Sequence, residues 1–139
     1  MNIEVNILAI LIAAFSSMFI GYIWYGSDTF GFGKKWAALT KIDIKKSSTP
    51  LALISAGISA LVLAFGLAVM AYVWQSYSNE SYLASALTVG LFVWLFFQAL
   101  RMFQRARFNQ EPVQATWIHL ANEFVTVMVA SLIIGLFGV

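Results

Sequence analysis

One histidine and one glutamate in an apolar stretch are the side chains best suited to chemistry in this chain. The stretch TWIHLANEFVTVMV (116–129) contains His119, the only histidine, and Glu123 four residues later. On an α-helix this spacing places both side chains on one face, one turn apart. An imidazole and a carboxyl group arranged in this way can share a proton, pair with a cation or contribute ligands to a metal ion. Asn122 adds an amide to the same polar group.

Three interpretations of this polar group stay open. In the first, a protonated or paired Glu123 is structural: it hydrogen-bonds His119, Asn122 or a polar residue of another segment such as Gln98, and so fixes the helix register. In the second, Glu123 changes charge when a proton or substrate enters a cavity, and His119 relays protons toward the cytoplasm. In the third, His119 and Glu123 hold a metal ion. Because two ligands do not make a metal site and no third ligand is evident, we predict no metal and no cofactor.

The residues that conventional catalysis requires are missing. The chain contains no cysteine, which excludes thiolate metal sites and cysteine nucleophiles. It offers serines in the apolar segments, but no second histidine and no acidic pair beside them. A serine, histidine and acid triad would therefore rest on coincidence, and we predict that the protein is not an enzyme.

The composition indicates a membrane protein. Hydrophobic residues make up 61% of the 139 residues and charged residues 10%, against roughly 45–50% and 25% in soluble domains. Four apolar segments, at about residues 3–24, 50–74, 82–103 and 113–138, are long enough to cross a hydrocarbon core of about 30 Å. We predict an all-α polytopic integral membrane protein in which residues 1–139 form one four-helix domain. Glu123 then lies about 16 Å along the last helix, close to the bilayer midplane.

The positions of the basic residues predict the orientation. Five lie in the connection 26–49 and three lie around the connection between the third and fourth segments. They are Lys34, Lys35, Lys41, Lys45, Lys46, Arg101, Arg105 and Arg107. The positive-inside rule places both connections in the cytoplasm and both termini on the non-cytoplasmic side of the cell inner (plasma) membrane. The net charge of +2 thus reflects orientation in the lipid bilayer, and we expect no nucleic-acid partner.

Aromatic residues fit the same orientation. A group near the predicted cytoplasmic ends is expected to form an interfacial belt: Tyr22, Trp24, Tyr25, Trp36 and Trp117. The connection 26–49 interleaves aromatic residues with lysines, which favours a segment that lies on the inner leaflet.

Small residues recur every four positions and predict helix packing faces. The first segment carries Ala9, Ala13, Ser17 and Gly21, and the second carries Ala52, Ala56, Ala60, Ala64 and Ala68. In the last segment the same spacing runs through Ala115, His119, Glu123, Val127, Ser131 and Gly135. Small residues let helix backbones approach closely in lipid, so we expect the polar pair to face protein. Four short helices barely enclose a pathway, which favours a homo-oligomer or a subunit of a larger membrane complex.

Two aromatic motifs carry a resemblance to a known family. The sequence NILAILIAAF (6–15) leads to GYIWYG (21–26) and FGKKW (32–36), and the last segment contains HLANEFVTVMVASLIIG (119–135). With these features the chain resembles the small four-helix bacterial membrane proteins called domain of unknown function seventeen-sixty-one. The resemblance implies the fold and places GYIWYG at the end of the first span. It implies no reaction.

Two functions follow from the sequence. We expect an accessory, assembly or interaction subunit that packs against partner helices through its small-residue faces. The alternative is a small proton- or cation-coupled transporter or channel-like unit with Glu123 as its ionisable centre. The alternative requires that a cavity reach Glu123.

Overall fold

The protein is helical throughout the part of the chain that the structure describes. The computed structural model describes residues 4–26 and 28–139, and these residues form no strand. Four of their helices are long and apolar enough to cross a membrane: Ile7–Gly26, Pro50–Ser78, Tyr82–Phe108 and Val113–Phe137. The predicted class, an all-α polytopic membrane protein with four transmembrane helices, is confirmed. The predicted start at residue 3 lies outside the described residues, and the second and third helices extend beyond the predicted ends at 74 and 103.

Two of the membrane helices contain a π-helical segment, which lies at the end of the first helix and in the middle of the third. The first consists of α1 (Ile7–Gly21) and a π-helical segment at Tyr22–Gly26. The third consists of α5 (Tyr82–Phe92), a π-helical segment at Val93–Ala99 and α6 (Leu100–Phe108). A π-helical turn is wider than an α-helical turn, so it redirects the side chains that follow it.

The other membrane helices are continuous and begin where local chemistry favours a start. For α4 (Pro50–Ser78), the hydroxyl of Thr49 accepts a hydrogen bond from the Ala52 amide at 3.2 Å, and proline occupies the first helical position. Proline suits this position because its missing N–H would have no partner there. Pro112 directly precedes α7 (Val113–Phe137). Each start thus follows from the residues at the boundary.

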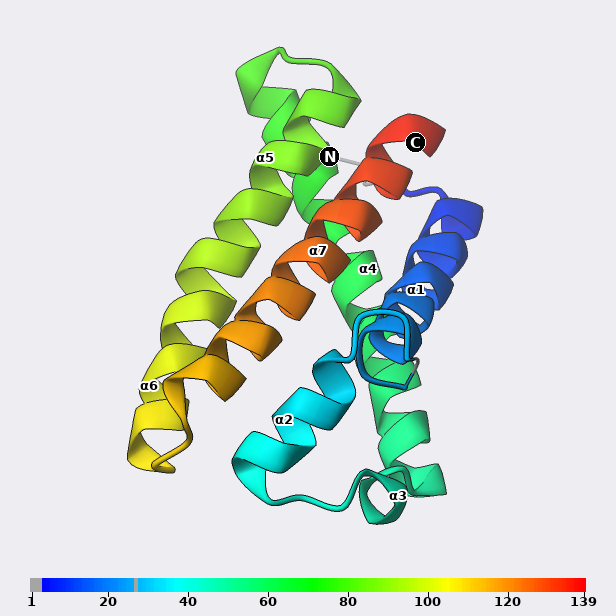
Figure 1. Cartoon of the computed structure of the whole chain (residues 1–139). Helices are drawn as coiled ribbons and strands as arrows, with labels where there is room; N and C mark the ends of the chain where they lie inside the picture. Colours follow the sequence, from blue (N-terminus) through cyan, green and yellow to red (C-terminus); the bar gives the residue numbers. More distant parts are fainter. Residues whose placement is uncertain (1–3, 27) are drawn as a thin grey trace.

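The start of α1 and the C-terminus lie at one end of the bundle, and the charged connections lie at the other (Figure 1). The short helices α2 (Phe32–Thr40) and α3 (Ile44–Ser47) connect the first membrane helix to α4 at this second end, beside the α6–α7 link. The end that holds α2, α3 and the last turns of α6 also carries the eight lysines and arginines, and we call it the basic end. Four crossings therefore return the C-terminus to the side where α1 begins.

Helix α7 is the central helix of the bundle. It packs most extensively against α5 and α1, and lies between them in Figure 1. Its side chains Val127, Ala130 and Ser131 are fully buried. A Cβ atom on Gly135 would lie 2.8 Å from the Cα atom of Leu83 in α5. The small-residue stripe of the last segment thus allows a close backbone approach, which stabilises helix association in lipid.

The predicted small-residue faces of the first two spans are used in part. Ala9, Ala13 and Ser17 of α1 and Ala60 and Ala64 of α4 are buried, whereas Gly21 is half-exposed and Ala56 is exposed. From residue 50 to residue 59, every position of α4 except 57 is exposed. Ala56 therefore does not lie in a helix contact within this chain, because the first turns of α4 do not pack on the bundle as its second half does.

Replacement of Gly135 by alanine tests the α5–α7 approach. The added methyl group would meet the backbone of Leu83, which cannot rotate away, so we expect a loss of about 1–3 kcal/mol of stability, as for other overpacked cores. Thermal unfolding followed by circular dichroism in detergent micelles measures the change. Gly66→Ala is the matched control, because no atom lies within 4 Å of its added Cβ. Equal unfolding temperatures for Gly135→Ala and Gly66→Ala would contradict the close approach.

Candidate functional site

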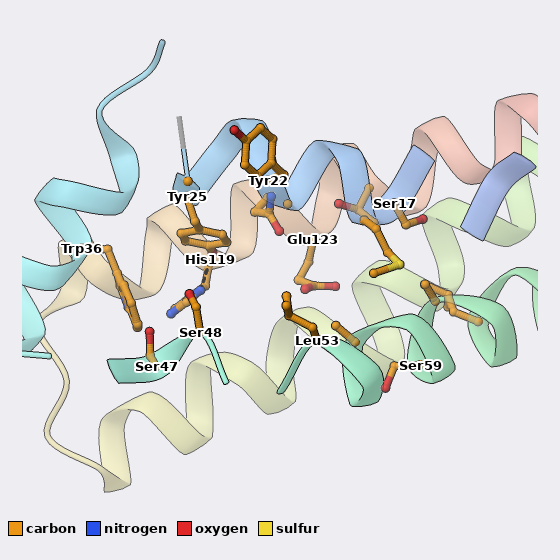
Figure 2. Close-up of a pocket in the computed structure, with 18 of the residues that line it drawn as sticks. Ser17, Tyr22, Tyr25, Trp36, Ser47, Ser48, Leu53, Ser59, His119 and Glu123 are labelled. Atoms are coloured by element: carbon orange, nitrogen blue, oxygen red, sulfur yellow. Dashed lines mark hydrogen bonds between the residues drawn. The ribbon is translucent and has the colours of Figure 1, made fainter. Parts of the chain in front are cut away.

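A cavity of about 620 Å³ lies between α1, α4 and α7 and extends to α3 at the basic end (Figure 2). It is formed where the first turns of α4 do not pack on the bundle. The four polar residues that the sequence singled out all line it: His119, Asn122, Glu123 and Gln98. Three come from α7, and Gln98 comes from the π-helical segment at Val93–Ala99. The structure thus brings the predicted polar group together at one cavity wall.

Glu123 points into this cavity without a partner. Figure 2 shows its side chain in the space between α7 and α4. Within the described part of the chain, no hydrogen bond or ion pair reaches its carboxyl group, and no lysine or arginine lines the cavity. The structural interpretation expected a hydrogen bond from Glu123 to His119, Asn122 or a neighbouring span. The described residues make no such bond.

His119 is instead held by aromatic residues. Its Nδ1 atom and the hydroxyl group of Tyr25 share a hydrogen bond of 2.5 Å. The imidazole ring also packs edge-on against the ring of Trp36, with centroids 5.4 Å apart. Tyr25 and Trp36 contact each other at a centroid distance of 5.9 Å. His119 is therefore oriented by two side chains from outside its own helix.

The two aromatic motifs of the sequence build this arrangement. A Cβ atom on Gly33 of FGKKW would lie 1.8 Å from the carbonyl oxygen of Tyr25 in GYIWYG, so only glycine lets α2 dock there. Trp24 packs on Phe32 with ring centroids 4.7 Å apart. Its Nε1 atom also donates a hydrogen bond to the Ile118 carbonyl oxygen at 3.2 Å. These contacts fix the end of the first span, α2 and α7 to one another.

Three polar atoms of the cavity wall, two from side-chain amides and one from a hydroxyl group, are buried without hydrogen bonds. The Nδ2 atom of Asn122, the Oγ1 atom of Thr126 and the Oε1 atom of Gln98 have no partner among the described residues. Asn122 is 6% exposed and Thr126 is 8% exposed, and both line the cavity. Buried polar atoms are nearly always hydrogen-bonded in native proteins. The Ser85 and Ser131 hydroxyls and the Arg107 Nε atom are unpartnered as well but do not line this cavity, so what distinguishes the three cavity atoms is their place on the wall that holds the Glu123 carboxyl group.

A second cavity of about 200 Å³ shares His119 with the first. It lies toward the basic end and is lined by Met102, Arg105, Ala106, Glu111, Thr116 and His119. His119 is thus the residue common to an inner cavity that contains Glu123 and an outer cavity that contains Glu111 and Arg105.

The predicted membrane-surface residues lie away from the inner cavity. Seven of the eight are exposed, and Lys34 forms an exposed ion pair with Asp28 at 2.6 Å. Arg107 is half-buried instead, and its Nη2 atom donates to the Glu111 carbonyl oxygen at 2.7 Å and to the Thr116 hydroxyl at 2.9 Å. Arg107 therefore stabilises the α6–α7 link, a role that its place in a basic cluster did not predict.

Tyr25 and Trp36 are the site residues that sequence reasoning missed. They were assigned to an interfacial belt, but both line the inner cavity. Their place in GYIWYG and FGKKW, the two motifs that carry the family resemblance, could have identified them as candidate site residues. Across residues 4–26 and 28–139, no three acidic or histidine side chains gather where they could hold a metal ion.

Together, the fold and the site define a four-helix membrane protein with a largely apolar cavity in the bundle, into which one acidic side chain points. The sequence model of the family described as "Protein of unknown function (DUF1761)" matches residues 8–135, and the chain belongs to this family. The predicted family is thus confirmed. No curated protein and no solved structure matches the chain.

The Tyr25→Phe variant tests how His119 is held. The chain has one histidine, so a sample labelled with ¹⁵N-histidine gives the signals of a single imidazole ring. We expect the Nδ1 resonance to move when the tyrosine hydroxyl is removed, because its hydrogen-bond partner is lost. Tyr77→Phe is the matched control, since Tyr77 is 83% exposed at the other end of the bundle. An unchanged Nδ1 resonance in Tyr25→Phe would show that the bond does not form.

Proposed function

We propose that this protein is a small proton- or cation-coupled membrane protein of the transporter or channel-like kind, with Glu123 as its ionisable centre. The observation that carries the proposal is the unpaired Glu123 carboxyl group in a cavity of about 620 Å³ within the bundle. An ionised carboxylate at the bilayer centre costs about 2.5–3.5 kcal/mol on insertion scales. A proton and a bound cation are two ways to avoid this cost, so Glu123 can exchange one for the other.

The position of His119 supports a route for the proton. It lines both the inner cavity and the outer cavity, and an imidazole can accept a proton on one nitrogen and release one from the other. The charged groups that face it from the outer cavity are Glu111 and Arg105. On this proposal, protons pass between Glu123 and the basic end by way of His119. No covalent step is needed, and we propose no enzymatic activity.

The orientation and location are part of the same proposal. The basic end faces the cytoplasm by the positive-inside rule, and both termini face outward across the inner (plasma) membrane. The lipid bilayer is then the protein's immediate partner, with lysines of α2 and α3 at the inner leaflet.

A second candidate function is an accessory or assembly role, for which a second copy of the chain is the simplest partner. The first turns of α4 favour it, because Leu51 is 76% exposed and the small residues Ala52 and Ala56 are exposed beside it. Small residues on an uncovered helix face suit close packing against another helix in lipid. Ala56 also lines the inner cavity, so a two-fold partner packed on this face would occupy or close the side of the cavity that α4 forms.

Infrared difference spectroscopy tests the ionisable centre. In protein reconstituted into lipid, we expect Glu123 to convert from carboxylic acid to carboxylate as the pH of the sample is raised, because the cavity admits protons. The Glu123→Gln variant keeps size and hydrogen-bonding capacity but cannot ionise, so the band difference must disappear in it. A carboxyl group that keeps one protonation state throughout would contradict the proposal and favour a structural role.

Single cysteines test the accessory role. The natural chain contains no cysteine, so one cysteine introduced at each position from 51 to 59 reports only its own surroundings. If a second copy packs on this face, at least one position near the two-fold axis will give a disulfide-linked dimer on oxidation in membranes. Leu100→Cys is the control, since Leu100 is 63% exposed on a different helix. An absence of cross-links over the whole series, or equal cross-linking at position 100, argues against this interface.

A further inference from the structure

The inner cavity has the size and the walls of a site for a small organic molecule. Ligand pockets of roughly 300–1,000 Å³ bury most of a drug-sized molecule, and this one measures about 620 Å³. Apolar side chains from α1, α3 and α4 line much of it, including Met18, Ile44 and Leu53. A fully hydrated inorganic ion would gain nothing from these walls. They favour a ligand with an aromatic or alkyl body.

The charges around the cavity select the sign of the ligand. Among the residues that the structure describes, Glu123 is the only acidic one that lines the cavity, and no lysine or arginine does. In the low dielectric of a membrane bundle, a carboxylate attracts a cation more strongly than it would in water. An anion would meet no lysine or arginine, and would find a counter-charge only where the His119 imidazole is protonated. The cavity is therefore complementary to one positive charge.

The aromatic end of the cavity strengthens this preference. Tyr25 and Trp36 line it and are arranged edge to face, and Tyr22 lines it as well. Aromatic faces attract cations through their negative quadrupole, most strongly where water is excluded. A cation between Glu123 and these rings would be stabilised from both sides.

The unpartnered polar atoms are a second, independent observation that points to a ligand. Asn122 and Thr126 are both more than nine-tenths buried, they line the cavity, and each has a polar atom without a partner among the described residues. The Ser85 and Ser131 hydroxyls and the Arg107 Nε atom are also buried without a partner, but they do not line this cavity. What distinguishes Asn122 and Thr126 is their place on the wall that holds the unpaired carboxyl group. Here they lie within one turn of Glu123 on α7.

We propose that the inner cavity binds a lipophilic organic cation, an ammonium or phosphonium ion with aromatic or alkyl groups, with Glu123 as counter-charge and Tyr25 and Trp36 as aromatic walls. This inference rests on the proposed function, because it names the cation that exchanges with the proton. Membrane-soluble cations of this class partition into the bilayer, which brings them to the depth of the cavity.

Binding of tetraphenylphosphonium to the full chain in lipid nanodiscs tests the proposal. Isothermal titration calorimetry should give saturable binding of tetraphenylphosphonium and none of tetraphenylborate, its anion of similar shape. We expect Glu123→Gln to weaken the affinity at least about tenfold, because the amide removes the counter-charge in a low-dielectric site. Glu80→Gln is the matched control and should bind as the natural chain does, since Glu80 is exposed in the link between α4 and α5. Trp36→Leu should weaken binding severalfold, and Trp36→Phe, which keeps a ring, should restore part of the loss.

The outcomes separate this inference from the proposed function. If Glu123 titrates in the infrared experiment but tetraphenylphosphonium does not bind, the ligand class is wrong and the ionisable centre stands. Equal affinity in Glu123→Gln, or equal binding of tetraphenylborate, also overturns the inference. If Glu123 does not titrate and no cation binds, both proposals fail. Because the comparison of cation with anion uses the natural chain alone, it decides the question even if a variant does not fold.

Discussion

Polar groups inside a membrane have no water to pair with, and this constraint organises the interior of the bundle. The indole of Trp24 donates to the Ile118 carbonyl oxygen, and the indole of Trp94 donates to that of Leu120, each at 3.2 Å. Both bonds fasten neighbouring helices to α7, the most buried helix. Since unsatisfied polar groups are costly in hydrocarbon, such bonds determine which helix faces can meet. Three of the exceptions line the inner cavity: the Gln98 Oε1, Asn122 Nδ2 and Thr126 Oγ1 atoms are buried without a partner among the described residues. The other three, Ser85 Oγ, Ser131 Oγ and Arg107 Nε, lie elsewhere in the bundle.

The cavity exists because packing is uneven along α4. The second half of this helix packs closely on the bundle through Ala60, Ala64 and Ala68. The first turns do not, and α2 and α3 occupy the basic end beside them (Figure 1). The close contact of Gly33 with the Tyr25 carbonyl oxygen holds α2 in this place. The contact between Gly33 and Tyr25 thus helps to shape the inner cavity, which reaches from the basic end toward the middle of the bilayer.

Hydropathy and spacing predicted much of this arrangement from the sequence. Four apolar segments were enough to predict four spans, because each must cross the same hydrocarbon thickness. The i, i+4 spacing placed His119 and Glu123 on one helix face, and the scarcity of polar residues in the spans made Gln98 a candidate neighbour. The small-residue rule failed to distinguish Ala56 from Ala60, since whether a face is covered depends on tertiary packing and not on the periodicity of one helix. Tyr25 and Trp36 were missed for a related reason: an aromatic residue near a helix end fits an interfacial belt and a cavity wall equally well, and only the docking of α2 decides between them.

The π-helical segments have a consequence for how this protein tolerates changes in length. Tyr22–Gly26 and Val93–Ala99 both contribute to the inner cavity, the first through Tyr22 and Tyr25 and the second through Gln98. Each residue of a regular α-helix turns the chain by about 100°. Each residue of a π-helical turn turns the chain by less, so the wider turn accommodates one extra residue. Deletion of one residue that restored α geometry in either segment would therefore leave the residues on both sides close to their present helix faces, while the side chains within the segment moved. Homologues that differ by one residue here would look alike as membrane proteins, yet present different side chains from these segments to the inner cavity.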